Sequence, residues 1–393
     1  MYICHAMENL HKDIYISRQA EARVKEYLSA FPVIGVAGPR QSGKSTLLKN
    51  LLKDSFQYVS FDDFRNRQLF HEDPVRFMKT WPDYIIFDEA QYVPELFSWI
   101  KIAVDADRQR YGRFVVTGSG QFMLNQRISE SLAGRIGMIT LLPFQYSEIP
   151  DHLKEESIFA GSYPEPVIRN YKFGTQWYQA YLETYLQKDV RQLINIGDLA
   201  GFTAFLRTLA AQTGQVLNLS EISRGIGISV NTLGRWLSVL ESSYIIFRLQ
   251  PYYKNLGKRL IKSPKVYFYD TGLVSLLTGI ESRQEWEKGI LYGSLFENYI
   301  ISELFKRKYH ENKRMDLYYF RTSNGDEIDL IIDHGLTFEM VEIKASMTWK
   351  PDQMKTLKKY TGEASGARLV YQGDTYPDVD GIQVINYKDF LLA

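Results

Sequence analysis

The segment GPRQSGKST constrains the fold of this 393-residue chain more than any other stretch. It fits the pattern G-x-x-x-x-G-K-[ST] and follows the apolar run from Phe31 to Ala37. We expect a buried strand, then a loop whose backbone N–H groups face one point, then a helix whose positive dipole end adds to that point. A Gly- and Ser-rich surface turn is the alternative, but the strand pattern before the loop and Leu47–Leu48 after it favour phosphate binding. The candidate nucleotide-binding residues are Gly38, Pro39, Arg40, Gln41, Ser42, Gly43, Lys44, Ser45 and Thr46.

The same motif predicts what individual side chains do beside the phosphates. Lys44 would reach the β- and γ-phosphates of ATP, and the Ser45 hydroxyl would hold Mg²⁺. A second apolar run, Tyr84 to Phe87, ends in Asp88 and Glu89, as a buried strand does at an active-site edge. We expect Asp88 to hold Mg²⁺ with Ser45, and Glu89, pointing to the other side of the strand, to orient the attacking water. This Walker B pattern predicts Mg²⁺-dependent ATP hydrolysis, the alternative being a strand that ends in two solvated acids.

Two further positions are candidates for sensing or stabilising the nucleotide. The apolar run from Phe114 to Val116 leads to small hydroxyl residues, of which Ser119 is our candidate sensor of the γ-phosphate and Thr117 the second choice. Arg135, next to a glycine, could stabilise charge on a nucleotide in its own or a neighbouring subunit. An ordinary ion-paired arginine is the equally simple interpretation of Arg135.

Composition places limits on the class of protein. Hydrophobic residues make up 45% of the chain and aromatic residues 14%, which argues for packed globular units. The formal net charge is +1, so any contact with nucleic acid has to come from a local basic patch. The single cysteine, Cys4, excludes an intrachain disulfide and a thiolate metal cage. No apolar stretch is long enough to span a bilayer or resembles a secretion signal, so we expect a cytoplasmic protein without a membrane partner.

The pattern along the chain predicts several domains. Residues 12–150 alternate between strand and helix, which predicts an α/β fold with a mostly parallel sheet covered by helices on both faces. Residues 151–200 read as a helical connector. The expected strands of the first domain are Val33 to Ala37, Tyr58 to Phe61, Tyr84 to Phe87, Phe114 to Thr117 and Ile136 to Leu142.

Residues 201–284 show the pattern of a helix-turn-helix followed by a hairpin, or winged helix. Ser220 and Ser229 are expected to cap the two helices, and the second helix would present Asn231 and Arg235 outward. The hairpin would pair Tyr244 to Phe247 with Val266 to Tyr269. The segment between its strands is basic and has no acid, which suits a DNA backbone; its basic residues are Arg248, Lys254, Lys258, Arg259, Lys262 and Lys265. A protein-docking module with a solvated basic loop is the alternative.

Residues 285–393 read as a small α/β domain. Asn324–Gly325 predicts a two-residue hairpin, and strand alternation predicts that side chains from a helix and two strands meet on one face. The residues expected to converge are Glu297, Asp329, Glu342 and Lys344. Three carboxylates and a lysine could hold Mg²⁺ or Mn²⁺ for phosphodiester chemistry, while a salt-bridged amphipathic sheet is the alternative.

With these motifs in place, nearly the whole chain resembles predicted prokaryotic ATPases of the AAA superfamily whose C-terminal half is a winged helix joined to a restriction-endonuclease-like domain. The resemblance rests on GPRQSGKST, YIIFDEAQ, VVTGSG, SLAGR with the following LLPF, GSLFEN, EIDLII and VEIKAS. It implies ATP and Mg²⁺ binding through Lys44, Ser45 and Asp88, and catalysis involving Glu89. Carried over position by position, the PD-(D/E)XK nuclease motif falls on Glu297, Asp329, Glu342 and Lys344.

Together these features predict an ATP-driven switch that repositions a winged-helix and nuclease-like module on DNA. A nucleotide-gated regulatory or scaffold protein that binds another protein and cuts nothing remains the alternative, and an oligomer is compatible with both.

Overall fold

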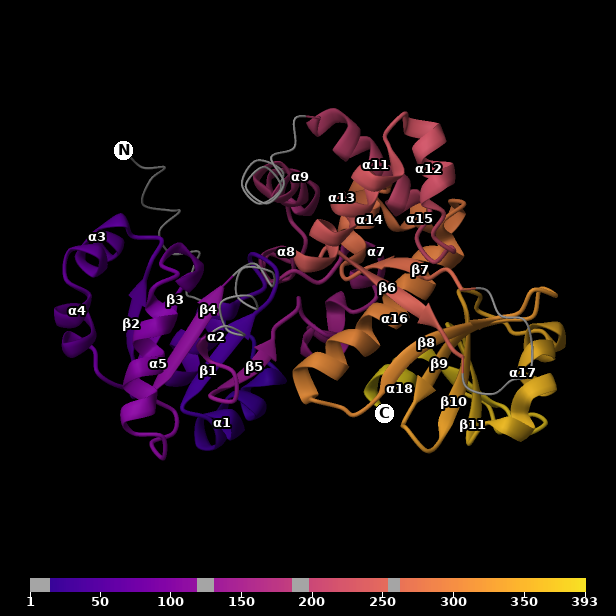
Figure 1. The fold of residues 1–393 in the computed structure, drawn as a ribbon. Helices are drawn as coiled ribbons and strands as arrows, with labels where there is room; N and C mark the ends of the chain where they lie inside the picture. Colours follow the sequence, from indigo (N-terminus) through magenta and orange to yellow (C-terminus); the bar gives the residue numbers. More distant parts are fainter. Residues whose placement is uncertain (1–14, 119–130, 186–197, 254–261) are drawn as a thin grey trace, which may run out of the picture. The chain divides into compact units, whose positions relative to one another are not determined.

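The computed structural model describes residues 15–118, 131–185, 198–253 and 262–393. By its internal contacts the chain divides into two compact units (Figure 1). The N-terminal unit comprises Met1–Leu141 with Ile168–Asn170, and the C-terminal unit comprises Leu142–Val167 with Tyr171–Ala393.

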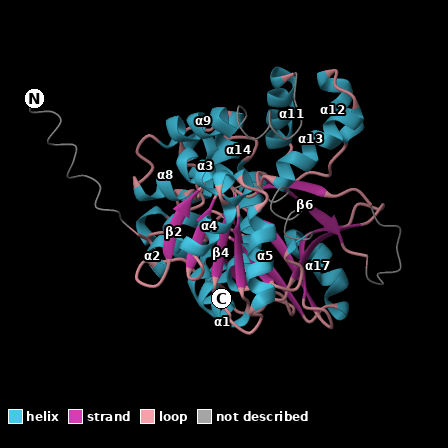
Figure 2. Ribbon diagram, turned by 60° about the vertical axis from the view of Figure 1, so that its left-hand side comes forward, coloured by secondary structure: helices cyan, strands magenta, loops and turns pink. Residues whose placement is uncertain are grey.

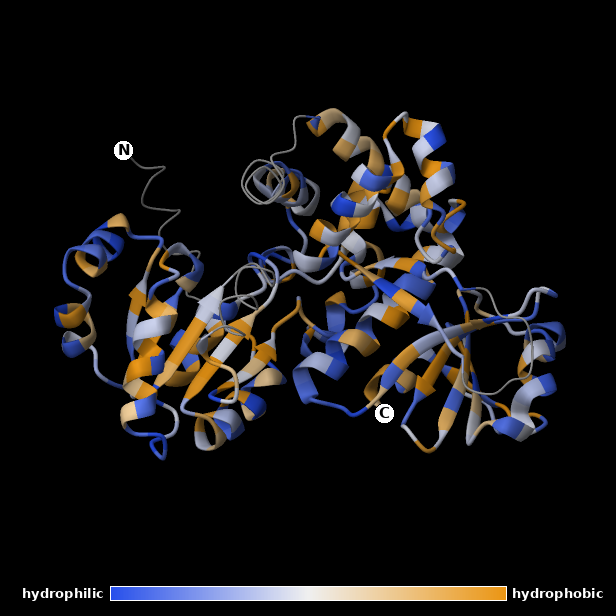
Figure 3. Cartoon of the chain, in the orientation of Figure 1, coloured by the Kyte–Doolittle hydropathy of each residue, from blue (hydrophilic) through white to orange (hydrophobic). Residues whose placement is uncertain are grey.

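The N-terminal unit is built on a five-stranded sheet in the order β2-β3-β4-β1-β5, and all of its paired strands are parallel. Figure 3 shows its central strands mostly in the orange of apolar residues. The strands are β1 (Val33–Ala37), β2 (Gln57–Ser60), β3 (Ile85–Asp88), β4 (Phe114–Gly118) and β5 (Ile136–Thr140). The β1 prediction is confirmed residue for residue. The others differ by one or two residues at an end, because apolar runs and hydrogen-bonded segments do not end at the same residues.

Helices cover both faces of this sheet (Figure 2). Along β1, Val33 packs into one apolar cluster and Ile34 and Val36 into another, as strand alternation requires. The helices α1 (Ala20–Ala30) and α2 (Lys44–Leu52) pack into the cluster of Ile34. The opposite cluster takes side chains from α3 (Phe64–Glu72), α4 (Pro74–Thr80) and α5 (Leu96–Ala106). The predicted α/β class with a helix-covered parallel sheet is therefore confirmed.

The C-terminal unit contains a seven-stranded sheet in the order β12-β11-β10-β9-β8-β6-β7. Its strands are β6 (Ile246–Pro251), β7 (Lys265–Phe268), β8 (Asp316–Arg321), β9 (Glu327–Asp333), β10 (Phe338–Lys344), β11 (Gly366–Tyr371) and β12 (Gln383–Asn386). The predicted hairpin of β6 and β7 exists, and β6 also pairs with β8 in parallel. The hairpin is thus the edge of the same sheet that carries the later strands.

Helices of different lengths surround this sheet. They are α7 (Ser157–Ala160), α8 (Pro164–Ile168), α9 (Gly174–Tyr185), α11 (Leu199–Ala211), α12 (Leu219–Ile226), α13 (Val230–Ser242), α14 (Thr271–Thr278), α15 (Arg283–Lys288), α16 (Tyr292–Glu311), α17 (Lys355–Tyr360) and α18 (Tyr387–Leu392). The helix α16 is the central one, because its side chains are buried on several sides of the helix. It is not amphipathic, so it lies in the core.

Two local predictions were wrong in detail. The cap of α12 is Asn218, whose side chain accepts from Glu221 N, and not Ser220, whereas Ser229 caps α13 as expected. The β8–β9 turn has a three-residue loop closed by Thr322 N donating to Asp326 O, with Gly325 at φ +91°. Glycine takes the left-handed position that ends such loops, which is why an Asn-Gly pair is present without forming a two-residue turn. No helix in the described segments is long and apolar enough to cross a bilayer.

Candidate functional site

The predicted phosphate loop lies between β1 and α2. Gly38 has φ +152°, and a Cβ atom on it would lie 2.1 Å from Leu141 O, the residue after β5. Only glycine therefore fits where the loop leaves the sheet. Gly43, at φ +91°, precedes the first residue of α2, so the amino end of this helix opens into the loop.

Lys44 is folded back onto the loop that carries it. Its Nζ donates to Gly38 O at 3.1 Å and to Pro39 O at 2.8 Å, and the residue is only 5% exposed. Arg18, from the segment before α1, donates from Nη1 to Ser42 O at 2.8 Å and braces the loop from behind. Sequence reasoning missed Arg18, since a single arginine outside the motif gives no signal. A desolvated ammonium beside a helix amino end is ready to exchange carbonyl partners for phosphate oxygens.

Ser45 and Asp88, the predicted Mg²⁺ pair, lie together. Ser45 Oγ is 3.0 Å from both carboxylate oxygens of Asp88, which ends β3. The hydroxyls of Thr117 and Tyr58 also donate to this carboxylate. Burial, together with Asp88, raises the pKa of Tyr58. A carboxylate next to a hydroxyl offers the hard oxygen ligands that Mg²⁺ takes, so these residues fit the ion expected beside ATP phosphates.

Glu89 departs from its expected geometry. Strand β3 ends at Asp88, and Glu89 has φ +55°, so the alternation of a pleated strand does not determine where its side chain points. Its N–H donates to Thr117 Oγ1 at 3.2 Å, and its carboxylate accepts from the Gln91 amide. A non-glycine residue with positive φ is strained, and such strain often marks a functional position. Thr117 joins Asp88 to Glu89, whereas Ser119, the first choice as sensor, lies outside the described residues.

Arg135 is not brought to the phosphate loop of its own chain. It precedes β5, and its carbonyl accepts from Val33 N, so it lies where β1 begins, while the loop follows the end of β1. Five strand residues separate the two edges, about 16 Å at ~3.3 Å per residue. Its guanidinium is held by Asp105, with Nη2 at 2.7 Å from Oδ1. This geometry matches the interpretation of Arg135 as an ordinary ion-paired arginine. Arg135 could act on a nucleotide only if that nucleotide were bound by a neighbouring subunit.

The predicted DNA-contact residues are only partly described. Asn231 and Arg235 lie exposed on α13, as expected. Arg248, on β6, forms an ion pair with Glu241 of α13, and its Nε lies 2.6 Å from Glu241 Oε1. Lys254, Lys258 and Arg259 lie outside the described residues. Lys265 is 2% exposed and cannot contact a DNA backbone from that position.

The residues predicted to form a nuclease-like site do converge. We call Lys265, Glu297, Glu327, Asp329, Glu342 and Lys344 the acid–lysine cluster. Lys344 Nζ lies 2.7 Å from Glu342 Oε1 and 3.4 Å from Asp329 Oδ2. Lys265 Nζ lies 3.2 Å from Glu297 Oε1 and 2.7 Å from Glu327 Oε1. Sequence reasoning missed Lys265, Glu327 and Tyr267, whose hydroxyl donates to Glu297 Oε1 at 2.5 Å.

Burial dominates the electrostatics of this cluster. Desolvation, followed by the charge of Asp329, raises the pKa of Glu342 to about 8. Desolvation also raises the pKa of Glu297. Burial alone would lower the pKa of Lys265 and of Lys344, but the neighbouring carboxylates raise both. The two ammonium groups thus stay charged and compensate the acids.

The cluster does not fit a metal centre in this arrangement. Within the described ranges, no group of three or more His, Cys, Asp or Glu side chains is placed to hold a metal ion. The two lysine ammonium groups contact all four of the cluster's carboxylates. One buried oxygen, Glu342 Oε2, has no hydrogen-bond partner, and the Asp329 carboxylate accepts from Ile343 N at 2.8 Å.

Comparisons with known proteins divide the chain in three. Residues 30–150 match the model of the AAA domain, residues 151–284 that of a domain of unknown function (DUF8612), and residues 292–390 that of another (DUF4143). A protein of Mycobacterium tuberculosis is 29% identical over 361 residues, which cover 91% of this chain and 80% of that protein. A Haemophilus influenzae protein is 24% identical over 400 residues, covering 91% and 93%.

Among solved structures, a Walker-type ATPase of Pyrococcus abyssi aligns with a TM-score of 0.47 at 17% identity, over 68% of this chain and 97% of that one. The family match and the loop geometry agree for the N-terminal part. Residues 30–150 therefore match the AAA domain in sequence, and the loop between β1 and α2 has the backbone of a P-loop.

Proposed function

We propose that the N-terminal unit binds ATP with Mg²⁺ and hydrolyses it. The observation that carries the proposal is the contact between Ser45 and Asp88, at the edge of the sheet where the phosphate loop leaves β1. A hydroxyl and a carboxylate from separate motifs have no structural need to meet there, whereas an ATPase needs both beside the phosphates.

Each residue has a distinct task in this proposal. Lys44 exchanges the carbonyls of Gly38 and Pro39 for phosphate oxygens. Ser45 and Asp88 hold Mg²⁺, which neutralises phosphate charge when bound. Glu89 orients the attacking water, and Thr117 fixes the Glu89 backbone relative to Asp88.

Nucleotide binding tests the loop assignment directly. Titration of the full chain with a fluorescent ATP analogue should show saturation, and Lys44→Ala should abolish it because the loop loses the cation that faces the phosphates. Lys53→Ala is the control, since Lys53 lies exposed just after the same helix. Equal affinity for Lys44→Ala and the parent would refute the assignment.

We also propose that the C-terminal unit contacts DNA through the exposed face of α13. This is supported by Asn231 and Arg235, which project from a helix capped by Ser229 and preceded by the turn at Gly227. Charge reversal of Arg235, Arg248, Lys254, Lys258 and Arg259 should weaken DNA binding and flatten its salt dependence by about one slope unit per lost phosphate contact. Unchanged binding would favour the protein-docking alternative.

The acid–lysine cluster favours the salt-bridged alternative over a metal-dependent nuclease. Its two lysine ammonium groups contact the carboxylates and so compensate their charge in place of a metal ion. The assay that separates the two compares cleavage of linear and branched DNA by the parent, Asp329→Ala and Lys344→Ala, with Mg²⁺ or Mn²⁺ and with or without ATP. Cleavage by the parent that both substitutions remove would restore the nuclease prediction.

A further inference from the structure

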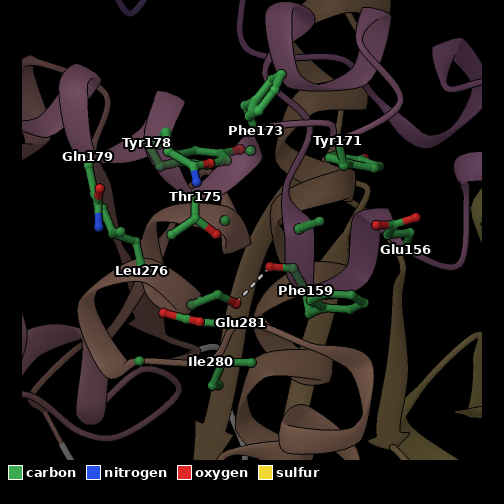
Figure 4. Close-up of a pocket in the computed structure, with 16 residues that line it drawn as sticks. Glu156, Phe159, Tyr171, Phe173, Thr175, Tyr178, Gln179, Leu276, Ile280 and Glu281 are labelled. Atoms are coloured by element: carbon green, nitrogen blue, oxygen red, sulfur yellow. Dashed lines mark hydrogen bonds between the residues drawn. The ribbon is translucent and has the colours of Figure 1, made fainter.

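A cavity of about 240 Å³ lies within the C-terminal unit, and none of its lining residues belongs to the acid–lysine cluster. Its walls come from α7, α9 and α14 and the segments that flank them (Figure 4). An engineered cavity of roughly 150 Å³ accepts benzene, so this one has room for a ligand group larger than an aromatic ring.

The inner wall of the cavity is aromatic and its hydroxyl groups are already used. Tyr178 OH donates to Asp270 Oδ1 at 2.7 Å, Tyr171 OH to Gly161 O at 2.7 Å, and Ser275 Oγ to Phe159 O at 2.6 Å. These hydrogen bonds fix the two tyrosine rings and occupy their hydroxyl groups. A ligand would therefore contact the faces of the rings and would form no hydrogen bonds with these hydroxyls. Close packing also holds the ring of Tyr178 in place, since a Cβ on Gly272 would lie 2.4 Å from Tyr178 Cζ.

The mouth of the cavity is acidic. The carboxylates of Glu156 and Glu281 lie on two sides of the open space in Figure 4. Neither forms a side-chain ion pair within the described residues, and no lysine or arginine lines the cavity. Burial raises the pKa of Glu156.

Two further features favour a positively charged guest. The helix α14 ends at the cavity with Gly279 as its C-cap, so the negative end of its dipole lies beside Glu281. Phe173, 59% exposed, presents its ring at the mouth, and Lys172 Nζ lies 5.4 Å from the centre of that ring. This contact shows that an ammonium group can be accommodated on Phe173.

We propose that this cavity binds an alkylammonium or alkylguanidinium group, with the alkyl stem against Leu276 and Ile280 and the cation between Glu156 and Glu281. Aromatic walls with a few convergent polar groups are typical of sites for small ligands, and the uncompensated carboxylates select the charge. The amino end of α9 also lines the cavity at Gly174 and Thr175, and Gly174 N already donates to Tyr171 O at 2.9 Å. The guest is either a free polyamine or the side chain of a basic residue in another protein.

Calorimetric titration of the full chain with three probes tests this proposal. The probes are putrescine, butylguanidinium and arginine capped at both ends, and pentanamide is the neutral control. We expect saturable binding of at least one cation and none of the amide. Binding of free amines but not of capped arginine would identify the guest as a small molecule, and the reverse would identify it as a protein side chain.

Substitutions assign the binding to this cavity. Glu156→Gln and Glu281→Gln should each weaken binding about threefold, and together about tenfold, because both carboxylates are partly solvated. Glu363→Gln, which removes an exposed carboxylate elsewhere in the same unit, should change nothing. The proposal is overturned if no cation binds, if pentanamide binds equally well, or if the double variant binds like the parent.

Discussion

The hydroxyl of Ser45 lies 3.0 Å from both carboxylate oxygens of Asp88, although 43 positions separate the two residues along the chain. Strand β4 lies between β1 and β3 in the sheet, so this contact reaches across a strand. The side chain of Thr117, from that intervening strand, completes it by donating to Asp88. Helix α2, which follows β1, and the strands β3 and β4 thus contribute to one group of polar side chains at the carboxyl edge of the sheet, where α/β proteins bind ligands.

Gly38→Ala should lower the free energy of unfolding by more than the cost of a left-handed backbone at a non-glycine residue. The added Cβ would lie 2.1 Å from Leu141 O, so the loop or the strand end has to move. We expect a loss of stability of at least about 2 kcal/mol and weakened ATP binding. Gly134→Ala is the matched control, because Gly134 has φ +74° with open space around it. It should cost only about 1–2 kcal/mol for the left-handed backbone. Equal losses in urea denaturation would contradict the predicted clash.

Thr117→Val should separate binding from turnover. The change keeps the shape of the side chain but removes the hydroxyl that joins Asp88 to Glu89 N. ATP affinity should stay within about threefold of the parent, while hydrolysis should fall about tenfold, because the water-orienting residue loses its support. Thr80→Val removes an exposed helix hydroxyl and should leave both quantities unchanged. A variant that hydrolyses ATP like the parent would show that Thr117 has no positioning role.

Lys265→Met should destabilise the C-terminal unit by about 3 kcal/mol, because it leaves the largely buried carboxylate of Glu297 without its ammonium partner. Adding Glu297→Gln should recover much of this loss, since the uncompensated charge disappears with it. Lys262→Met, which changes an exposed lysine nearby, should have little effect. Denaturation of Lys265→Met, Glu297→Gln and the double variant measures the coupling, and losses that simply add would show that the pair contributes nothing.

The raised pKa of Glu342 predicts a pH dependence of stability. Its pKa is about 8 in the folded chain, against an ordinary 4.5, so between these values the folded state holds a proton that the unfolded state has lost. Stability therefore falls as pH rises from about 4.5 to about 8. Glu342→Gln should reduce this slope, and Glu363→Gln should not. Urea midpoints measured across this range would contradict the assignment if the slope of Glu342→Gln equals that of the parent.

The parts of the fold that were predictable carry a local signal. Apolar runs of strand length, each ending in small or acidic residues, located β1, β3 and β4 and indicated which residues would meet at their ends. The unpredicted parts depend on contacts between distant residues. Arg18 and Tyr58 reach the phosphate loop and Asp88 from segments without a motif. Lys265 reads as one more lysine in a basic stretch, and only the pairing of β6 with β8 places β7 beside α16 and makes this lysine part of the acid–lysine cluster.

The rate of Mg²⁺-dependent ATP hydrolysis in Glu89→Gln tests the central claim most directly. This variant should bind ATP like the parent and lose turnover by about 100-fold or more, because it lacks the carboxylate that orients the attacking water. Glu95→Gln, an exposed acid at the start of α5, should hydrolyse ATP at the parent rate. Parent-like hydrolysis in Glu89→Gln, or hydrolysis by the parent that proceeds equally well without Mg²⁺, would contradict the proposed site.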